Sequence, residues 1–254
     1  MGSLHAGHLS LVKLARSRCD RVVVSLFVNP TQFGANEDLA AYPRDEAGDA
    51  ALLAGVGCDL IYAPAPSEIY PLGFATTVTV SGLTEIMEGS SRPTHFAGVA
   101  TVVTKLLIQV SPRIAVFGEK DYQQLQMIRR LAGDLDLPVE IVGGPIIRDR
   151  DGLALSSRNA YLTAAERQVA PRLHRRLGDV ASMICTGQRI DLAEAAGVAS
   201  LLADGFSDVD YLETRNPETL ERLGPHRLAC PARLLCAVRL GTVRLLDNLA
   251  IDAA

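Results

Sequence analysis

The sequence has few cysteines, and their spacing argues against both a disulfide scaffold and a zinc site. The five are scattered along the chain: Cys19, Cys58, Cys185, Cys230 and Cys236. No two of them form a C-x-x-C pair, and their number is odd. This pattern is typical of a protein in a reducing compartment, with thiols that are free or buried.

Long apolar runs and an excess of basic charge are also lacking. No stretch approaches the roughly 18 apolar residues that a membrane span requires. The first residues lack a basic region followed by an apolar block, so we expect no signal peptide and a cytoplasmic location. The 25 basic residues are balanced by 29 acidic ones, which gives a net charge of −4. We therefore expect neither a nucleic acid nor a membrane surface as partner.

The sequence is long and apolar enough for one large or two ordinary domains, with 254 residues of which 48% are hydrophobic. Short apolar runs that read as strands occur at residues 21–29, 60–62, 76–80, 114–117 and 139–142. Helical patterns follow His8 and occupy residues 45–55, 99–110 and 122–131. This alternation predicts an α/β, Rossmann-like domain with a parallel sheet.

The pattern changes after about residue 147. Residues 164–184 and 192–202 read as helices, and residues 209–213, 233–240 and 243–246 as strands. Helices followed by strands indicate a small α+β domain. We expect a first domain at 1–146 and a second, lid-like domain at 147–254.

The chain opens with a glycine-bearing turn that carries His5 and His8, directly before a helical pattern. Residues three apart lie one turn apart in a helix, so both imidazoles can face one ligand. Gly2 and Gly7 permit close backbone approach, and we expect the free N–H groups of the helix start to point at a polyphosphate. The alternative is that the histidines only cap the helix.

Two other segments suit phosphate oxygens. Gly118–Asp121 follows the strand at 114–117 and offers the ammonium of Lys120, although an ordinary charged turn would look the same. Leu155–Asn159 combines two serine hydroxyls with a guanidinium. Its alternative is an N-cap for the helix that begins near Thr163.

Ligands of parallel sheets bind beyond the carboxyl ends of the strands. The polar features expected there are His5, His8, Asn29, Gln32 and residues 118–121. The amides of Gln32 and Gln124 suit a small polar substrate, but single glutamines are usually surface residues. His95, in a polar turn, could be a cap or a ligand.

Together these segments resemble the pantothenate synthetase family, whose motifs occur here in family order along the whole chain. The matching segments are Met1–His8, Phe27–Phe33, Asp38–Arg44, Arg92–Val99, Phe117–Gln124, Asp151–Asn159 and Arg244–Asn248. The resemblance implies a nucleotidyltransferase-like fold of the His-x-Gly-His type. It also implies an ATP-dependent ligase, usually a homodimer, in pantothenate and coenzyme A biosynthesis.

The implied reaction adenylates pantoate with release of pyrophosphate, after which β-alanine attacks the pantoyl adenylate to give pantothenate and AMP. The implied ATP contacts are Met1, Gly2, Ser3, Leu4, His5, Ala6, Gly7, His8, Gly118, Glu119, Lys120, Asp121, Ile147, Leu155, Ser156, Ser157 and Arg158. Gln32 and Gln124 would hold pantoate, and Gln32 would also border the β-alanine site.

In the same comparison, His8 is the proton donor, in our reading as an imidazolium. With His5, Lys120, Arg158 and Mg²⁺, it would offset the negative charge that develops on the transferring phosphate. Asp49 is the implied metal ligand, although relatives often have an acidic pair where this chain has Gly48–Asp49. Because acyl adenylates are already activated, the second step needs mainly a well-placed amine, and we expect no covalent enzyme intermediate.

The family usually has a further first strand before the histidine motif, and this sequence has none there. Because the loss of a central strand exposes a sheet edge, we expect either an upstream start or a truncated, weakly active remnant, and we favour the upstream start. Another nucleotidyltransferase of the His-x-Gly-His type is the remaining alternative, and pantoate-dependent pyrophosphate release distinguishes it.

Overall fold

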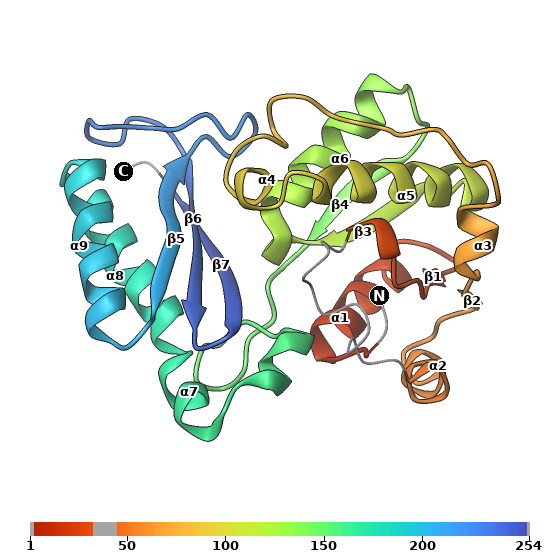
Figure 1. Ribbon diagram of the computed structural model, residues 1–254, viewed down its shortest axis with the longest axis horizontal. Helices are drawn as coiled ribbons and strands as arrows, with labels where there is room; N and C mark the ends of the chain where they lie inside the picture. The colour runs from red at the N-terminus through yellow and green to blue at the C-terminus, as the bar shows by residue number, and fades with distance from the viewer. Residues whose placement is uncertain (1–2, 33–44, 253–254) are drawn as a thin grey trace. The chain divides into compact units, whose positions relative to one another are not determined.

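The computed structural model describes residues 3–32 and 45–252 (Figure 1). The contacts divide the chain into two compact units. The first comprises Met1–Glu119 and Gln123–Pro145, and the second comprises Lys120–Tyr122 and Ile146–Ala254. Division into functional domains at residue 147 stays a prediction.

The first unit is built of short parallel strands and helices. Its helices are α1 (Ala6–Arg16), α2 (Glu46–Ala54), α3 (Pro66–Ile69), α4 (Glu88–Ser91), α5 (His95–Val110) and most of α6 (Tyr122–Asp134), with 3₁₀ turns η1 (Pro30–Gln32) and η2 (Glu119–Asp121). Strand β1 (Val23–Ser25) pairs in parallel with β2 (Leu60–Tyr62), and β3 (Ile114–Gly118) with β4 (Glu140–Gly144). Among the residues described, the two pairs share no ladder.

The cores of this unit follow from helical spacing. In α5, Val99, Val103 and Leu107 recur every four residues, and they pack in one cluster with Ile128 of α6 and Phe117 of β3. A second cluster joins α1 to β1 and α2. The helices therefore pack against the strands, and loops follow the strand ends.

Three predicted elements of the first unit differ from the structure. Residues 76–80 form no strand. Instead, the Val78 N–H donates to Thr101 Oγ1 at 2.9 Å, because alternating side chains do not by themselves supply a partner strand. The strand predicted at 21–29 is only Val23–Ser25, and the helix predicted from residue 99 begins at His95.

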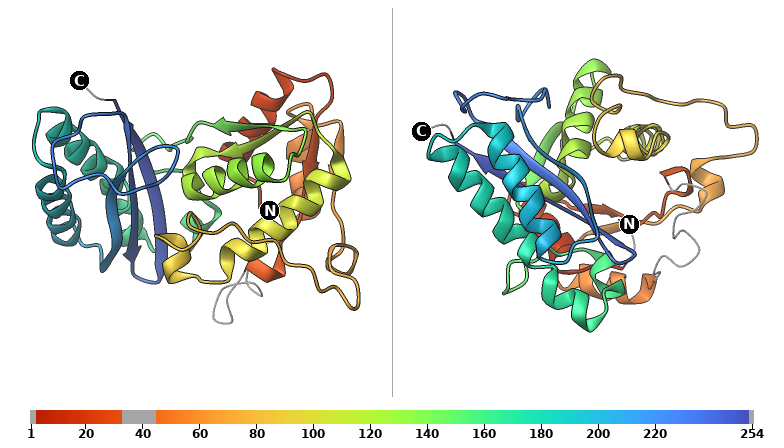
Figure 2. Two further views of the ribbon diagram at one scale, coloured as in Figure 1. Left: turned by 90° about the horizontal axis from the view of Figure 1, so that it is seen from above. Right: turned by 60° about the vertical axis from the view of Figure 1, so that its left-hand side comes forward.

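The second unit is a three-stranded antiparallel sheet covered by helices. Its strands, in the spatial order β5-β6-β7, are β5 (Asp208–Arg215), β6 (Ala232–Leu240) and β7 (Val243–Ile251). Its helices are α7 (Ala164–Val169), α8 (Arg172–Cys185) and α9 (Ile190–Ala203), preceded by the 3₁₀ turn η3 (Ser157–Tyr161). Figure 2 shows α8 and α9 side by side against the sheet, where Leu173, Leu177, Val180 and Ile184 of α8 enter the core.

The single helix predicted at 164–184 was wrong. The structure breaks it into α7 and α8 at Ala170–Pro171. Proline has no N–H to donate to the preceding turn, so Pro171 ends the first helical segment and stands as the N-cap of α8, which begins at Arg172. Among the described residues, no helix combines the length and apolar character needed to cross a bilayer.

Candidate active site

The two histidines of the first unit cap the start of α1 together. The Gly7 N–H donates to Nδ1 of His5 at 3.2 Å, and the His5 N–H donates to Nδ1 of His8 at 3.3 Å. The ring centroids lie 4.0 Å apart. When Nδ1 accepts a hydrogen bond, the N–H of the ring is at Nε2, so these contacts favour that tautomer for both rings.

This arrangement corrects part of the sequence interpretation. We expected free N–H groups at the helix start, but the N–H of Gly7 donates to an imidazole and the N–H of His8 donates to the His5 carbonyl at 2.8 Å. An imidazolium at His8 would also carry a proton on Nδ1 and lose its bond with the His5 N–H. In this geometry the N–H donor of each ring is the one at Nε2.

Asp49 of α2 holds the loop that precedes this helix. Its Oδ2 accepts the Ser3 N–H at 2.9 Å and its Oδ1 accepts the Leu4 N–H at 2.7 Å. The residue is only 3% exposed. Magnesium keeps several waters and needs open space around its ligand, so Asp49 does not fit the expected metal site. In the described part of the chain, no three His, Cys, Asp or Glu side chains cluster as metal ligands would.

Gln32 lies in η1, at the centre of a polar network. Its carbonyl accepts from Arg92 Nη2 at 3.2 Å and lies 3.0 Å from Nδ1 of His95. Its side-chain Oε1 lies 3.5 Å from Nδ2 of Asn29, a donor that also bonds the Gly98 carbonyl at 3.1 Å. Two segments singled out by sequence, Phe27–Phe33 and Arg92–Val99, therefore meet at this turn.

The network includes a tyrosine that sequence reasoning missed. The Tyr70 hydroxyl donates to Oδ1 of Asn29 at 2.8 Å, and burial raises the pKa of that hydroxyl. Tyr70 follows α3 in a proline-rich loop, and no local sequence pattern there predicts a contact with Asn29.

The other predicted substrate residue, Gln124, is half-buried on the first turn of α6. In the part of the chain that the structure describes, it forms no hydrogen bond with Gln32. Its neighbour Gln123 is buried and donates to the carbonyls of Leu83 and Ile86 at 2.7 and 2.8 Å, which is a structural role. Gln124 remains a candidate on sequence grounds.

Gly118 ends β3 and Glu119 begins η2, both in the first unit, and Lys120 and Asp121 belong by their contacts to the second. A Cβ at Gly118 would meet only Leu11 Cδ1, at 3.9 Å, so neighbouring atoms leave room for a side chain there. Lys120 lies in the 3₁₀ turn η2, which directly follows β3 in the sequence.

In the second unit, Ile147 and Leu155 face each other across a hairpin. The Leu155 N–H donates to the Ile147 carbonyl at 2.9 Å, and Arg148 and Ala154 form an antiparallel bridge beside them. Ser156 then caps η3 by accepting the Arg158 N–H on its hydroxyl at 3.3 Å. The helix α7 has its own cap, Thr163, so the serines are not needed there.

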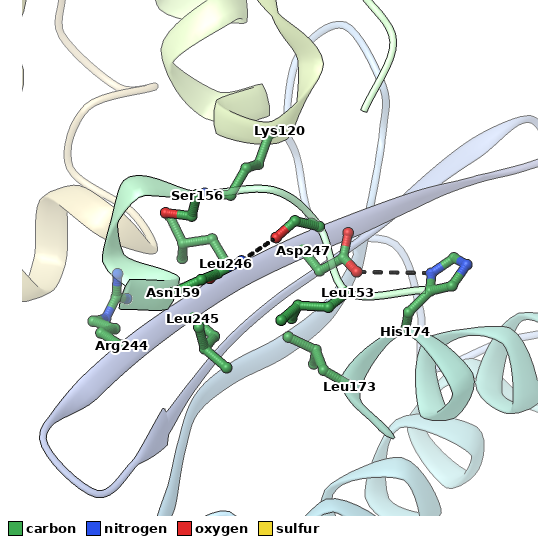
Figure 3. Close-up of a pocket in the computed structure, with 11 residues that line it drawn as sticks. Lys120, Leu153, Ser156, Asn159, Leu173, His174, Arg244, Leu245, Leu246 and Asp247 are labelled. Carbon is green, nitrogen blue, oxygen red and sulfur yellow. Dashed lines mark hydrogen bonds and ion pairs between the residues drawn. The ribbon is translucent and has the colours of Figure 1, made fainter. Parts of the chain in front are cut away.

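A cavity of the second unit brings together two of the predicted ATP contacts, Lys120 and Ser156 (Figure 3). Sequence reasoning did not assign His174 and Asp247, which also line it. His174 Nδ1 lies 3.7 Å from Asp247 Oδ2, and burial together with Arg148 lowers the pKa of the imidazole against the opposing effect of Asp247.

Comparison with known proteins assigns the chain to a family. The family model described as pantoate-beta-alanine ligase matches residues 1–250. The chain belongs to the pantoate–β-alanine ligase family. It is therefore an enzyme, a ligase, and the resemblance seen in the sequence is confirmed.

Pantothenate synthetases from several bacteria are similar over nearly the whole chain. The protein of Rhodospirillum rubrum is 59% identical over 251 residues, covering 99% of this chain and 89% of its own. That of Caulobacter vibrioides is 54% identical over 252 residues, covering 99% of this chain and 88% of its own.

Solved structures of the same family are also similar to this chain. The pantothenate synthetase of Thermus thermophilus has a TM-score of 0.94 and 49% identity, over 99% of this chain and 91% of its own. The pantoate-beta-alanine ligase of Francisella tularensis, solved in complex with "Beta-gamma ATP" and β-alanine, has a TM-score of 0.81 and 34% identity, over 98% of this chain and 86% of its own. The predicted α/β fold with a small C-terminal α+β part is confirmed.

Proposed function

We propose that this ligase condenses pantoate with β-alanine in two steps driven by ATP. A pantoate carboxylate oxygen attacks the α-phosphorus of ATP, and the bond to pyrophosphate breaks. The amine of β-alanine then attacks the acyl carbon of pantoyl adenylate, AMP leaves, and the amine loses a proton. Family membership and the histidine pair at the start of α1 support this proposal.

The proposal rests on the two imidazoles at the start of α1, whose ring centroids lie 4.0 Å apart and which are each held by a backbone N–H at Nδ1. Each ring is oriented by a backbone N–H on its Nδ1, so neither needs to reorganise when charge develops. We assign the pair to the phosphates of ATP, with His8 donating at the transferring group. Neutral imidazoles suffice for this role, since Nε2–H is a donor without a further proton.

Residues of both units are proposed to contact ATP. In the first unit these are Ser3, Leu4, Ala6, Gly7, Gly118 and Glu119, along with the histidine pair; Met1 and Gly2, also proposed, lie outside the described residues. In the second they are Lys120, Asp121, Ile147, Leu155, Ser156, Ser157 and Arg158. Lys120 supplies a point charge and Arg158 a planar fork, which suits phosphate oxygens.

Gln32 and Gln124 are proposed to bind pantoate, with Gln32 also next to β-alanine. The network of Arg92, His95 and Asn29 fixes the turn that carries Gln32, which supports a positioned amide there. A held amide can recognise a hydroxyl or carboxylate at lower entropic cost than a mobile one.

We propose that Mg²⁺ reaches the enzyme bound to ATP as part of that substrate, since Asp49 is occupied by backbone N–H groups. A homodimer and a cytoplasmic location complete the proposal. The free thiols at all five cysteines are compatible with a reducing compartment. Sedimentation velocity at micromolar concentration tests the dimer.

The adenylate route is tested by following carboxylate oxygen. Pantoate labelled with ¹⁸O in its carboxylate is incubated with ATP and β-alanine, and the products are analysed by mass spectrometry. The proposal expects one ¹⁸O in AMP and one in the amide of pantothenate. Formation of ADP and labelled inorganic phosphate would contradict it, since that outcome indicates a pantoyl phosphate.

A further inference from the structure

Strand β7 carries two neighbouring polar residues, Asp247 and Asn248, inside the second unit. They are 3% and 2% exposed. Polar groups this deeply buried are unfavourable unless hydrogen bonds replace those with water. They belong to the segment Arg244–Asn248, which matched the family motif but received no role from the sequence.

Asn248 holds the backbone of the segment that bears Lys120. Its Nδ2 donates to the Lys120 carbonyl at 3.0 Å, while its Oδ1 accepts from Arg233 Nε at 2.7 Å. The Arg233 guanidinium lies 4.2 Å from the ring centroid of Tyr122, whose hydroxyl donates to the Pro217 carbonyl at 3.0 Å. The contact with Asn248 uses the main chain of Lys120, so it orients the residue without engaging the ammonium.

Asp247 holds the second segment. Its carboxylate accepts from Arg148 Nη1 at 2.6 Å and from Arg148 Nη2 at 2.8 Å, a paired geometry that fixes the guanidinium plane. Arg148 also donates to the Gly152 carbonyl at 3.2 Å and bridges Ala154 across the hairpin. This hairpin leads directly into Ser156.

The two anchors are coupled to each other and to one cavity. The Asn248 N–H donates to Asp247 Oδ1 at 2.7 Å, so a shift of one residue disturbs the other. Lys120, Ser156 and Asp247 all line the cavity of Figure 3. One short stretch of β7 therefore supports both polar segments of this unit.

We infer that Asp247 and Asn248 are positioning residues that hold Lys120 and the Ser156–Arg158 segment in place for ATP. The inference rests on the proposed function, which assigns ATP to these segments. Neither residue is required to touch the nucleotide. Because a misplacement of about 1 Å can lower a rate by about 10²-fold, anchors of this kind affect turnover as well as stability.

The first test replaces Asn248 and measures pyrophosphate release from ATP and pantoate. Asn248→Asp keeps the size and the acceptor for Arg233 but removes the donor to Lys120. We expect kcat/KM for ATP to fall about 10- to 100-fold, with the KM for pantoate unchanged. Asn248→Ala removes both bonds, and we expect it to be at least as impaired.

Glu194→Gln is the matched control. Glu194 is a buried carboxylate of α9 that accepts from the Thr214 N–H at 2.6 Å and pairs with Arg222, but it contacts neither segment. We expect Glu194→Gln to lower the thermal midpoint and to leave kcat/KM for ATP at the parent value. An equal loss of kcat/KM in this control would overturn the inference, because it would indicate a general response to destabilisation.

A double-mutant cycle separates positioning from a structural role. If Asn248 acts through Lys120, Asn248→Asp should have less than about twofold further effect in a Lys120→Ala background. Additive losses would overturn the inference, as would Asn248→Asp with parent activity. A parent protein that releases no pyrophosphate would instead contradict the proposed function, and direct titration with a non-hydrolysable ATP analogue separates the two failures.

Discussion

Asp49 Oδ1 accepts the backbone N–H of Leu4 at 2.7 Å, across 45 positions of sequence. Because Oδ2 accepts the Ser3 N–H as well, the carboxylate anchors the loop before the histidine pair. These two hydrogen bonds explain why an aspartate is buried near the proposed phosphate site, and they do so without a bound metal.

We predict that Asp49→Asn weakens ATP binding without changing the dependence on Mg²⁺. The new amide turns a donor toward one of the two N–H groups, and an unsatisfied buried donor costs about 1–3 kcal/mol. The KM for ATP and the thermal midpoint should worsen, while the Mg²⁺ concentration for half-maximal rate stays constant. Asp45→Asn, at the N-cap of the same helix, should have little effect, since asparagine also caps well. A raised Mg²⁺ requirement in Asp49→Asn would restore the metal assignment.

Two replacements of His8 distinguish its two nitrogens. Glutamine can place an amide donor near the position of Nε2, whereas asparagine can place an acceptor near Nδ1, which caps the helix. We predict that His8→Gln retains more adenylation activity than His8→Asn, and that both bind pantoate normally. Rates of pyrophosphate release in single turnover check this order. If His8→Asn retained more activity than His8→Gln, the main role of His8 would be to cap the helix through Nδ1.

Gly98 of α5 is predicted to be required for the turn that carries Gln32. A Cβ there would lie 2.5 Å from the Thr31 carbonyl oxygen, so the turn must shift. Gly98→Ala should cost about 1–3 kcal/mol of the free energy of unfolding and raise the KM for pantoate more than that for ATP.

Gly178 of α8 provides the comparison, since nothing lies within 4 Å of a Cβ at that position. Gly178→Ala should stabilise the protein by about 0.5–1 kcal/mol and leave both KM values unchanged. If Gly98→Ala left the KM for pantoate unaltered, the turn that carries Gln32 would not be part of the pantoate site. Urea unfolding and steady-state kinetics supply both measurements.

The lowered pKa of His174 predicts that the protein loses stability at acid pH. Burial and Arg148 lower the pKa of its imidazole below the ordinary value, which the unfolded chain has. Above the unfolded pKa both states are neutral and the group contributes no pH dependence. As the pH falls through the unfolded pKa toward the folded one, the unfolded state takes up more protons, and stability declines.

His174→Asn places an amide near the position of Nδ1 and does not titrate. We predict that its free energy of unfolding declines less between pH 7.5 and pH 5 than that of the parent protein. Denaturant titrations at a series of pH values provide the comparison. Parallel curves for the two proteins would show that another group governs the acid response.

The sequence predicted features that depend on neighbours along the chain. The spacing of His5 and His8 indicated one shared face, and the strand before Gly118 was correctly placed. Pro171 indicates the break between α7 and α8, but the helical periodicity continues across it and led to the prediction of a single helix. Residues 76–80 alternate as a strand does, but no strand of the described chain pairs with them.

Contacts between distant residues carried no such signal. The pairs Arg148–Asp247 and Lys120–Asn248 are separated by 99 and 128 positions. Charge complementarity alone does not select one aspartate among many in a chain with 29 acidic residues. The supporting contacts of the candidate site therefore became visible only in the fold, whereas its motifs were visible in the sequence.

The most direct test of the account measures pyrophosphate release by this chain from ATP, with pantoate and β-alanine supplied separately. We predict release that requires pantoate, proceeds without β-alanine to about one equivalent per active site, and becomes multiple-turnover when β-alanine is added. Release that is independent of pantoate, or none with pantoate and ATP present, would contradict the assignment of this chain as an adenylate-forming pantoate ligase.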